Sequence, residues 1–170
     1  MTTCAPEKTT QDREGDVAAP KILVFSCRWC SGIGADDAGR QRLPMPPGFR
    51  CVSMECAAGI NPDIVLKAFS AGAEGVAVLG CHQDGCRYNQ ANHGTAKRME
   101  MLATLLETVG FGADRLLTSF GTAHEGHQFA ELMRRFSQKI AAMPSLTRRK
   151  SADAAGGCAD DRSEERRVGK

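Results

Sequence analysis

Short apolar runs alternate along this chain with longer segments whose apolar residues recur every three or four positions. The runs predict four buried strands, at residues 22–25, 49–54, 76–79 and 116–120. The longer segments predict three helices, which begin at Pro62, lie within about 92–109, and end near Ile140. Strands that alternate with helices are typical of an α/β domain with an open parallel sheet and right-handed crossovers.

Local signals predict details of these helices. Asn61 is expected to be the N-cap before Pro62, and Thr122–Glu125 is interpreted as a capping box for the last helix. Asp36 and Asp37 are interpreted as acids at a helix start. The helix within 92–109 is predicted to bury one apolar face, made of Met99, Leu102, Leu105, Leu106 and Val109.

The two ends of the chain have a composition typical of disordered tails. Residues 1–20 show no apolar period, and residues 144–170 are rich in alanine, glycine and charged side chains. Residues 162–170 also resemble a translated sequencing adapter, so we build no functional argument on them. We therefore expect one domain over residues 21–143, flanked by the two tails.

Charge and hydropathy narrow the functional class. The formal net charge is +2, and no basic face with interleaved aromatic residues suggests nucleic-acid binding. No stretch has the length and apolar character of a signal sequence or a membrane span. A cytoplasmic location is therefore expected. Since structural disulfides are disfavoured in that reducing compartment, metal binding or redox chemistry is the leading use for clustered thiols.

Five of the eight cysteines follow strands of the predicted sheet. Cys27, Cys56 and Cys81 stand at the carboxyl ends of three different strands, and Cys30 and Cys86 lie in the loops that follow two of them. Open parallel sheets bind their ligands beyond these ends. The fold is therefore expected to bring residues far apart in sequence together at one edge.

The other three cysteines are set aside as ligands. Cys4 and Cys158 lie in the predicted tails. Cys51 precedes Cys56 on the same strand by roughly 16–17 Å, at ~3.3 Å per residue. We therefore expect Cys51 to be a core residue near the opposite end of the strand.

Two local cysteine pairs carry the chemistry, Cys27-Arg-Trp-Cys30 and Cys81-His-Gln-Asp-Gly-Cys86. Iron–sulfur clusters are usually held by four thiolates, so five candidates suffice, although the spacing does not define the cluster type. Three alternatives remain open. They are a thiol–disulfide oxidoreductase centred on Cys27 and Cys30, a zinc-stabilised interaction module, and buried free cysteines.

Residues beside the cysteines suggest supporting roles. His82 is a candidate to tune a cluster through a hydrogen bond to sulfur, or to play a structural part in its loop. Arg28 and Trp29 are expected to contact a redox partner or to pack over the cluster. No glycine-rich phosphate-binding loop indicates a bound nucleotide.

The sequence resembles the delta subunit family of methyl-viologen-reducing (F420-non-reducing) hydrogenase over about residues 21–141. The motifs that carry this resemblance surround the five cysteines and continue into the helices. They are Ile22-Leu-Val-Phe-Ser-Cys-Arg-Trp-Cys-Ser31, Gly34-Ala-Asp36, Met54-Glu-Cys56, Pro62, Val65-Leu-Lys-Ala-Phe69, Gly72-Ala73, Gly75 to Gly80, Cys81-His82, Cys86, Tyr88-Asn89 and Lys97-Arg98.

We expect a single flavodoxin-like α/β domain. The resemblance implies that it binds a [2Fe–2S] cluster and acts as an electron-transfer subunit rather than a stand-alone catalyst. It implies electron flow from a hydrogenase or a formate dehydrogenase to a heterodisulfide-reductase-like flavoprotein. The family's cysteines correspond to Cys27, Cys30, Cys56, Cys81 and Cys86. Cys86 is the preferred fourth ligand, because it shares a loop with Cys81, and Cys30 is then the spare. Which of these two is the spare is left open.

Overall fold

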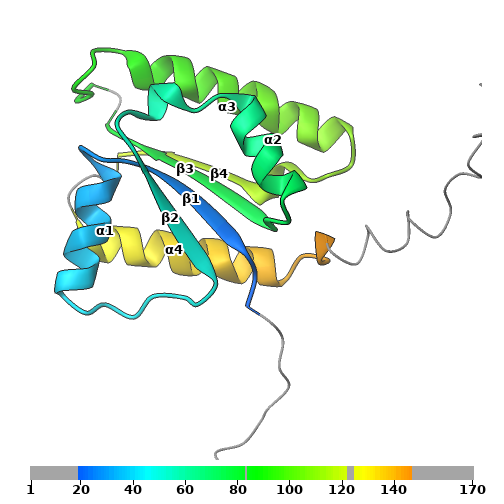
Figure 1. Cartoon of the computed structure of the whole chain (residues 1–170), viewed down its shortest axis with the longest axis horizontal. Coiled ribbons are helices and arrows are strands. Elements are labelled where there is room, and N and C mark those ends of the chain that lie inside the picture. The colour runs from blue at the N-terminus through cyan, green and yellow to red at the C-terminus, as the bar shows by residue number, and fades with distance from the viewer. Residues whose placement is uncertain (1–18, 83, 122–124, 147–170) are drawn as a thin grey trace, which may run out of the picture.

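The computed structural model describes residues 19–82, 84–121 and 125–146. Within them, a four-stranded parallel sheet has the order β2-β1-β3-β4 (Figure 1). The strands are β1 (Ile22–Cys27), β2 (Phe49–Met54), β3 (Gly75–Gly80) and β4 (Leu116–Phe120). The helices are α1 (Ser31–Arg40), α2 (Pro62–Ser70), α3 (Ala91–Thr108) and α4 (Gly126–Ala141), with short 3₁₀ turns η1 (Ala57–Gly59) and η2 (Ala113–Arg115). The predicted α/β class with an open parallel sheet is confirmed, and the strand order is the flavodoxin-like one.

Helices cover both faces of the sheet. α2 and α3 lie on one face, and α1 and α4 lie on the other (Figure 1). An apolar core lies on each face of the sheet, and the central strand β3 contributes to both. Its Val76 and Val78 belong to the core under α2 and α3, while Ala77 and Leu79 belong to the core under α1 and α4. A strand covered on both sides needs apolar residues at every position, which explains the continuous apolar run.

The edge strand β2 corrects one prediction. Cys51 is exposed there, whereas the sequence pattern indicated a core residue. Among the described residues the strand has only one neighbour, β1, and its four middle residues are all exposed. Cys51 pairs with Val24 in the register, three positions before Cys27, so its predicted separation from the other cysteines is correct.

The buried face of α3 also differs from the prediction. Met99, Leu102 and Leu106 are buried as expected, but Leu105 and Val109 are 57% and 73% exposed. The helix instead completes its buried face with two polar residues near its start, Asn92 and Thr95. Positions 92, 95, 99, 102 and 106 follow the helical repeat, and residues 105 and 109 lie beside that stripe.

Asp36 and Asp37 lie in the second half of α1, so their interpretation as acids at its start is wrong. Asp37 instead serves another helix, because its Oδ2 accepts a hydrogen bond from the Gly126 N–H at the start of α4, at 3.0 Å. This bond is the main cause that lowers the pKa of Asp37. α1 and α4 approach so closely here that a Cβ on Gly126 would lie 2.6 Å from the Ala38 nitrogen.

The remaining predictions on helix ends and boundaries are met in part. Asn61 is at the N-cap position of α2 and Pro62 is its first residue, as predicted. Of the proposed capping box, residues 122–124 lie outside the described residues, and Glu125 makes no side-chain capping bond. Both predicted tails, with Cys4 and Cys158, fall almost wholly outside the described ranges. Among the helices of the described ranges, none has the length and apolar character needed to span a bilayer.

Candidate metal centre

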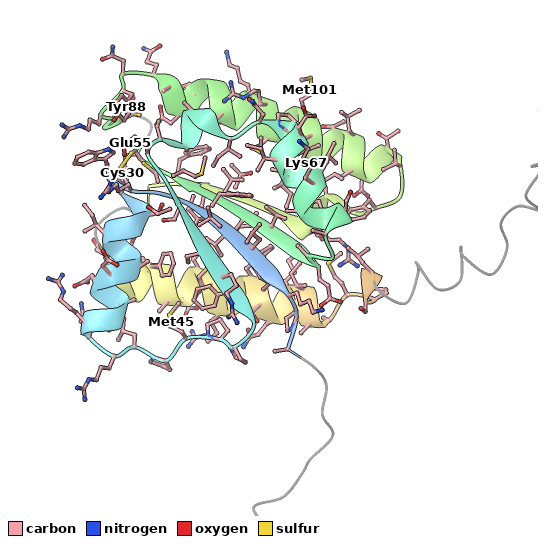
Figure 2. The ribbon with its side chains drawn as sticks, in the orientation of Figure 1. Cys30, Met45, Glu55, Lys67, Tyr88 and Met101 are labelled. Atoms are coloured by element: carbon pink, nitrogen blue, oxygen red, sulfur yellow. A yellow bond between two sulfur atoms is a disulfide. The ribbon has the colours of Figure 1, made fainter. Side chains whose placement is uncertain are left out.

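Three parallel strands bring cysteine-bearing segments to one edge of the sheet. Cys27 is the last residue of β1 and pairs in register with Met54, the last residue of β2. Cys81 directly follows β3, which pairs with β1 on its other side. In Figure 2, Cys30 and Glu55 lie together at this edge. The site thus lies where parallel sheets usually bind ligands.

A compact trio of buried sulfurs occupies the centre of this edge. The Sγ atoms of Cys27, Cys30 and Cys81 all lie within 4.8 Å of one another. Cys30 and Cys81 form a disulfide, and the Sγ of Cys27 lies 3.6 Å from that of Cys81. The exposed fraction is 1% for Cys27, 6% for Cys30 and 2% for Cys81. The trio is therefore largely shielded from water.

Cys56 and Cys86 form a less buried rim beside the trio. Burial is the main cause that raises the pKa of the Cys56 thiol, and the neighbouring thiols of Cys86 and Cys27 raise it further. A hydrogen bond from the Ala58 N–H to the Cys56 Sγ, at 3.4 Å, opposes this effect because it favours the thiolate. Closely spaced thiols resist ionisation together, and a bound cation would remove that cost.

Cys30 and Cys86, the two alternatives for the fourth ligand, occupy different parts of the site. Cys30 belongs to the buried trio, and Cys86 lies on the rim with Cys56. The Cys30 sulfur therefore lies close enough to the sulfurs of Cys27 and Cys81 to bind the same cluster. The preference for Cys86 as the fourth ligand stays a prediction.

Two buried serines fix the segment that carries Cys27 and Cys30. The Ser31 hydroxyl, which is fully buried, donates to the Leu79 carbonyl of β3 at 3.0 Å and lies 2.9 Å from the Ser26 hydroxyl. These contacts hold the start of α1 against the centre of the sheet. The Cys30 N–H also donates to the Cys27 carbonyl at 3.2 Å, which shapes the tight turn between the two cysteines.

Helix α3 fixes the segments that carry Cys81 and Cys56 through two polar residues that the sequence reasoning missed. Asn92 donates to the carbonyls of His82 and Cys81, at 2.7 and 3.3 Å. Thr95 donates to the Ala57 carbonyl at 3.2 Å, directly after Cys56. Their sequence signal is weak but present: two polar residues occupy the apolar stripe of a helix, and buried polar groups need specific partners.

Exposed residues surround the rim of the site. Trp29 and Tyr88 both donate hydrogen bonds to the Glu55 carboxylate, and both bonds lower the pKa of Glu55. The bond to Glu55 is the main cause that raises the pKa of Tyr88. The Arg28 side chain is mostly exposed, and the contact of Arg28 and Trp29 with a redox partner or with a cluster stays a prediction. The His82 ring lies against Gly121, where an added Cβ would be 3.1 Å from the His82 Cε1. Its role in tuning a cluster stays a prediction.

The donor set fits an iron–sulfur cluster. All five candidate donors are cysteine sulfurs, and an Fe–S cluster takes four thiolates, with backbone hydrogen bonds and exclusion of water setting its potential. Cys30 and Cys81 can donate thiolates only after the disulfide between them is reduced. A structural zinc ion would accept the same ligands. Such zinc domains usually depend on the metal to fold, whereas here two apolar cores support the sheet on both faces.

Mild oxidation of the metal-free protein is expected to link Cys30 to Cys81 rather than to Cys27, because that pair is already bonded in the structure. Peptide mapping by mass spectrometry after treatment with oxidised glutathione would measure this. Trypsin cuts after Arg28 and Asp-N cuts before Asp84, so Cys27, Cys30, Cys81 and Cys86 fall on four separate peptides. A dominant link between Cys27 and Cys30 would contradict the expected pairing and favour a CxxC redox site.

Comparison with known proteins gives a consistent result. Residues 22–144 match the family described as methyl-viologen-reducing hydrogenase, delta subunit. The vhc iron-sulfur subunit of the F420-non-reducing hydrogenase of Methanococcus voltae is 38% identical over 128 residues, covering 75% of this chain and 89% of that protein. The iron-sulfur subunit of the F420-non-reducing hydrogenase of Archaeoglobus profundus is 34% identical over 121 residues, covering 71% of this chain and 88% of that protein.

A third relative is much longer than this chain. It is one of the subunits of the ferredoxin:CoB-CoM heterodisulfide reductase of Methanosarcina mazei, and it is 36% identical over 121 residues. The match covers 71% of this chain but only 15% of that protein, so the same domain there forms part of a larger polypeptide. From the family match and the iron–sulfur subunits that resemble it, this chain belongs to the methyl-viologen-reducing hydrogenase delta subunit family.

Proposed function

We propose that this chain is a cytoplasmic electron-transfer subunit whose cysteines hold one [2Fe–2S] cluster. The observation that carries the proposal is the convergence of five cysteines at one sheet edge, three of them with sulfurs within 4.8 Å of one another. The hydrogenase iron-sulfur subunits that resemble the chain support it. A bound cluster would accept and donate single electrons there.

The chain's own residues would hold the cluster and set its potential. Four of Cys27, Cys30, Cys56, Cys81 and Cys86 would donate thiolates. The burial of Cys27 and Cys81 would exclude water from one side of the site, while the partly buried rim of Cys56 and Cys86 would leave the other side near the surface. The Ala58 N–H already points at the Cys56 sulfur, and such a bond stabilises negative charge on a ligand.

The partners are proposed from the relatives. Electrons would come from a hydrogenase or a formate dehydrogenase and pass to a heterodisulfide-reductase-like flavoprotein. In the heterodisulfide reductase of Methanosarcina mazei, a domain similar to this chain is part of one of the reductase polypeptides. A domain that is covalently joined to a reductase polypeptide in one organism is a reasonable candidate to associate with such a polypeptide in another.

Anaerobic reconstitution with iron and sulfide, after a thiol reductant has opened the disulfide between Cys30 and Cys81, tests the proposed function. We expect a coloured protein with thiolate-to-iron charge-transfer absorption, about two irons and two sulfides per chain, and an EPR signal after one-electron reduction. A colourless protein that retains one zinc ion per chain would overturn the proposal and favour the zinc-stabilised interaction module.

The thiol–disulfide alternative has one observation in its favour, the disulfide itself. That disulfide joins Cys30 to Cys81, however, and Cys27 is almost completely buried. A catalytic thiol of this class must be reachable by its substrate. The reduced protein should therefore fail to reduce insulin disulfides, and activity that disappears in a Cys27→Ser, Cys30→Ser variant would support the alternative.

A further inference from the structure

The Glu55 carboxylate joins three cysteine-bearing segments that come from different parts of the chain. Glu55 directly precedes Cys56 at the end of β2. Its Oε1 accepts a hydrogen bond from the Trp29 indole Nε1 at 2.8 Å, and another from the Tyr88 hydroxyl at 2.9 Å. Trp29 lies between Cys27 and Cys30, and Tyr88 lies two residues after Cys86. One oxygen atom thus connects all three segments. In Figure 2, Glu55 lies near Cys30 and Tyr88 at this end of the sheet.

Two arginines add further contacts to this group. The Arg87 guanidinium lies over the Trp29 ring, 4.0 Å from its centroid, and so joins the first segment to the third a second time. The Arg28 Nη1 lies 3.8 Å from the Glu55 Oε2, with both side chains mostly exposed. An exposed ion pair at that distance contributes little, so the two hydrogen bonds to Oε1 are the stronger link.

We propose that Glu55 is a positioning residue. Its hydrogen bonds hold the segments of Cys30, Cys56 and Cys86 against one another and so prevent solvent from reaching the buried thiols. Cys27, Cys30 and Cys81 are almost completely buried, although they lie in or beside loops at the molecular edge. A reagent reaches their sulfurs only when the segments separate. Separation must break the two hydrogen bonds to Glu55, so the carboxylate controls how often the site opens. This role is independent of which metal or cluster the thiols hold.

The rate of thiol alkylation in the reduced, metal-free protein measures this opening. We expect Glu55→Ala to speed alkylation of Cys27, Cys30 and Cys81 by about tenfold, since hydrogen bonds to a charged group are strong enough to shift an opening equilibrium by at least that factor. Glu55→Gln should remain close to the wild type. Its amide oxygen can still accept from Trp29 and Tyr88, and it loses only the exposed ion pair with Arg28. Glu100→Ala, at an exposed position on α3, is the matched control.

Trp29 is the only tryptophan, so its fluorescence reports directly on the surroundings of its hydrogen bond to Glu55. In Glu55→Ala we expect red-shifted emission and stronger quenching by acrylamide, while Glu55→Gln and Glu100→Ala should match the wild type. After cluster or zinc loading, release of the metal to a chelator should be faster in Glu55→Ala by a similar factor.

Three results would each overturn the proposal. The first is alkylation of Glu55→Ala at the wild-type rate. The second is a Glu55→Gln variant as reactive as Glu55→Ala, since the hydrogen bonds would then not be the cause. The third is a rise in reactivity that simply follows a lower melting temperature, because the thiols would then react through global unfolding. Since the alkylation assay uses metal-free protein, its outcome is separate from that of the proposed iron–sulfur function.

Discussion

Replacing Cys81 with serine is expected to lower the iron and sulfide retained after reconstitution by more than about tenfold. Cys81 is the central sulfur of the site, bonded to Cys30 and 3.6 Å from the Cys27 sulfur. A serine hydroxyl stays protonated at neutral pH and is a poor ligand for iron. The measurement is iron and acid-labile sulfide per chain, together with the visible absorption spectrum.

Cys51→Ser is the matched control for this experiment. Cys51 is exposed on the edge strand, and its register partner Val24 lies three positions before Cys27. The control should retain the wild-type amount of iron. Circular dichroism would verify that both variants are folded. Equal iron retention in Cys81→Ser and Cys51→Ser would show that the buried trio does not hold the cluster.

Phe129→Ala is expected to lower the free energy of unfolding by about 3–5 kcal/mol. Phe129 is 1% exposed and is the largest fully buried side chain of the described residues. It belongs to the core between α4 and the sheet, where Val24 and Leu79 also lie. Its removal leaves a cavity that rigid strands cannot close. Such a loss is a large part of the ~5–15 kcal/mol that typically stabilises a domain.

Urea unfolding of the metal-free, reduced protein would measure this effect. Leu105→Ala on the exposed side of α3 is the control, and its free energy of unfolding should stay within about 0.5 kcal/mol of the wild type. If both variants lost the same amount, the assignment of Leu105 to the surface of α3 would be contradicted. A loss below about 1 kcal/mol for Phe129→Ala would show that the core collapses around the gap.

The location of the candidate site follows from local sequence patterns combined with one general rule. Strands 49–54 and 116–120 have the predicted bounds, and the ends of β1 and β3 differ from the predicted ones by one or two residues. Because the strands are parallel, their carboxyl ends share an edge. The positions of Cys27, Cys56 and Cys81 after those ends therefore predicted a common site from the linear chain.

The surroundings of the site could not be predicted in the same way. The bond between Cys30 and Cys81, the Ser31 contact with the Leu79 carbonyl, and the Glu55 contacts with Trp29 and Tyr88 all join residues far apart in the chain. No periodicity encodes such contacts. They depend on how closely two segments approach after the strands have paired.

The sequence by itself determined the parallel sheet, three of the four helices of the described residues (α1 was not predicted), and the edge where the five cysteines gather. These features depend on residues close together in the chain, whose apolar period selects strand or helix locally. Only the tertiary structure decided that Cys51 is exposed, that Asp37 binds the start of α4, and that Leu105 faces away from the core. Burial depends on which elements become neighbours, and strand order and helix packing determine that over the whole domain.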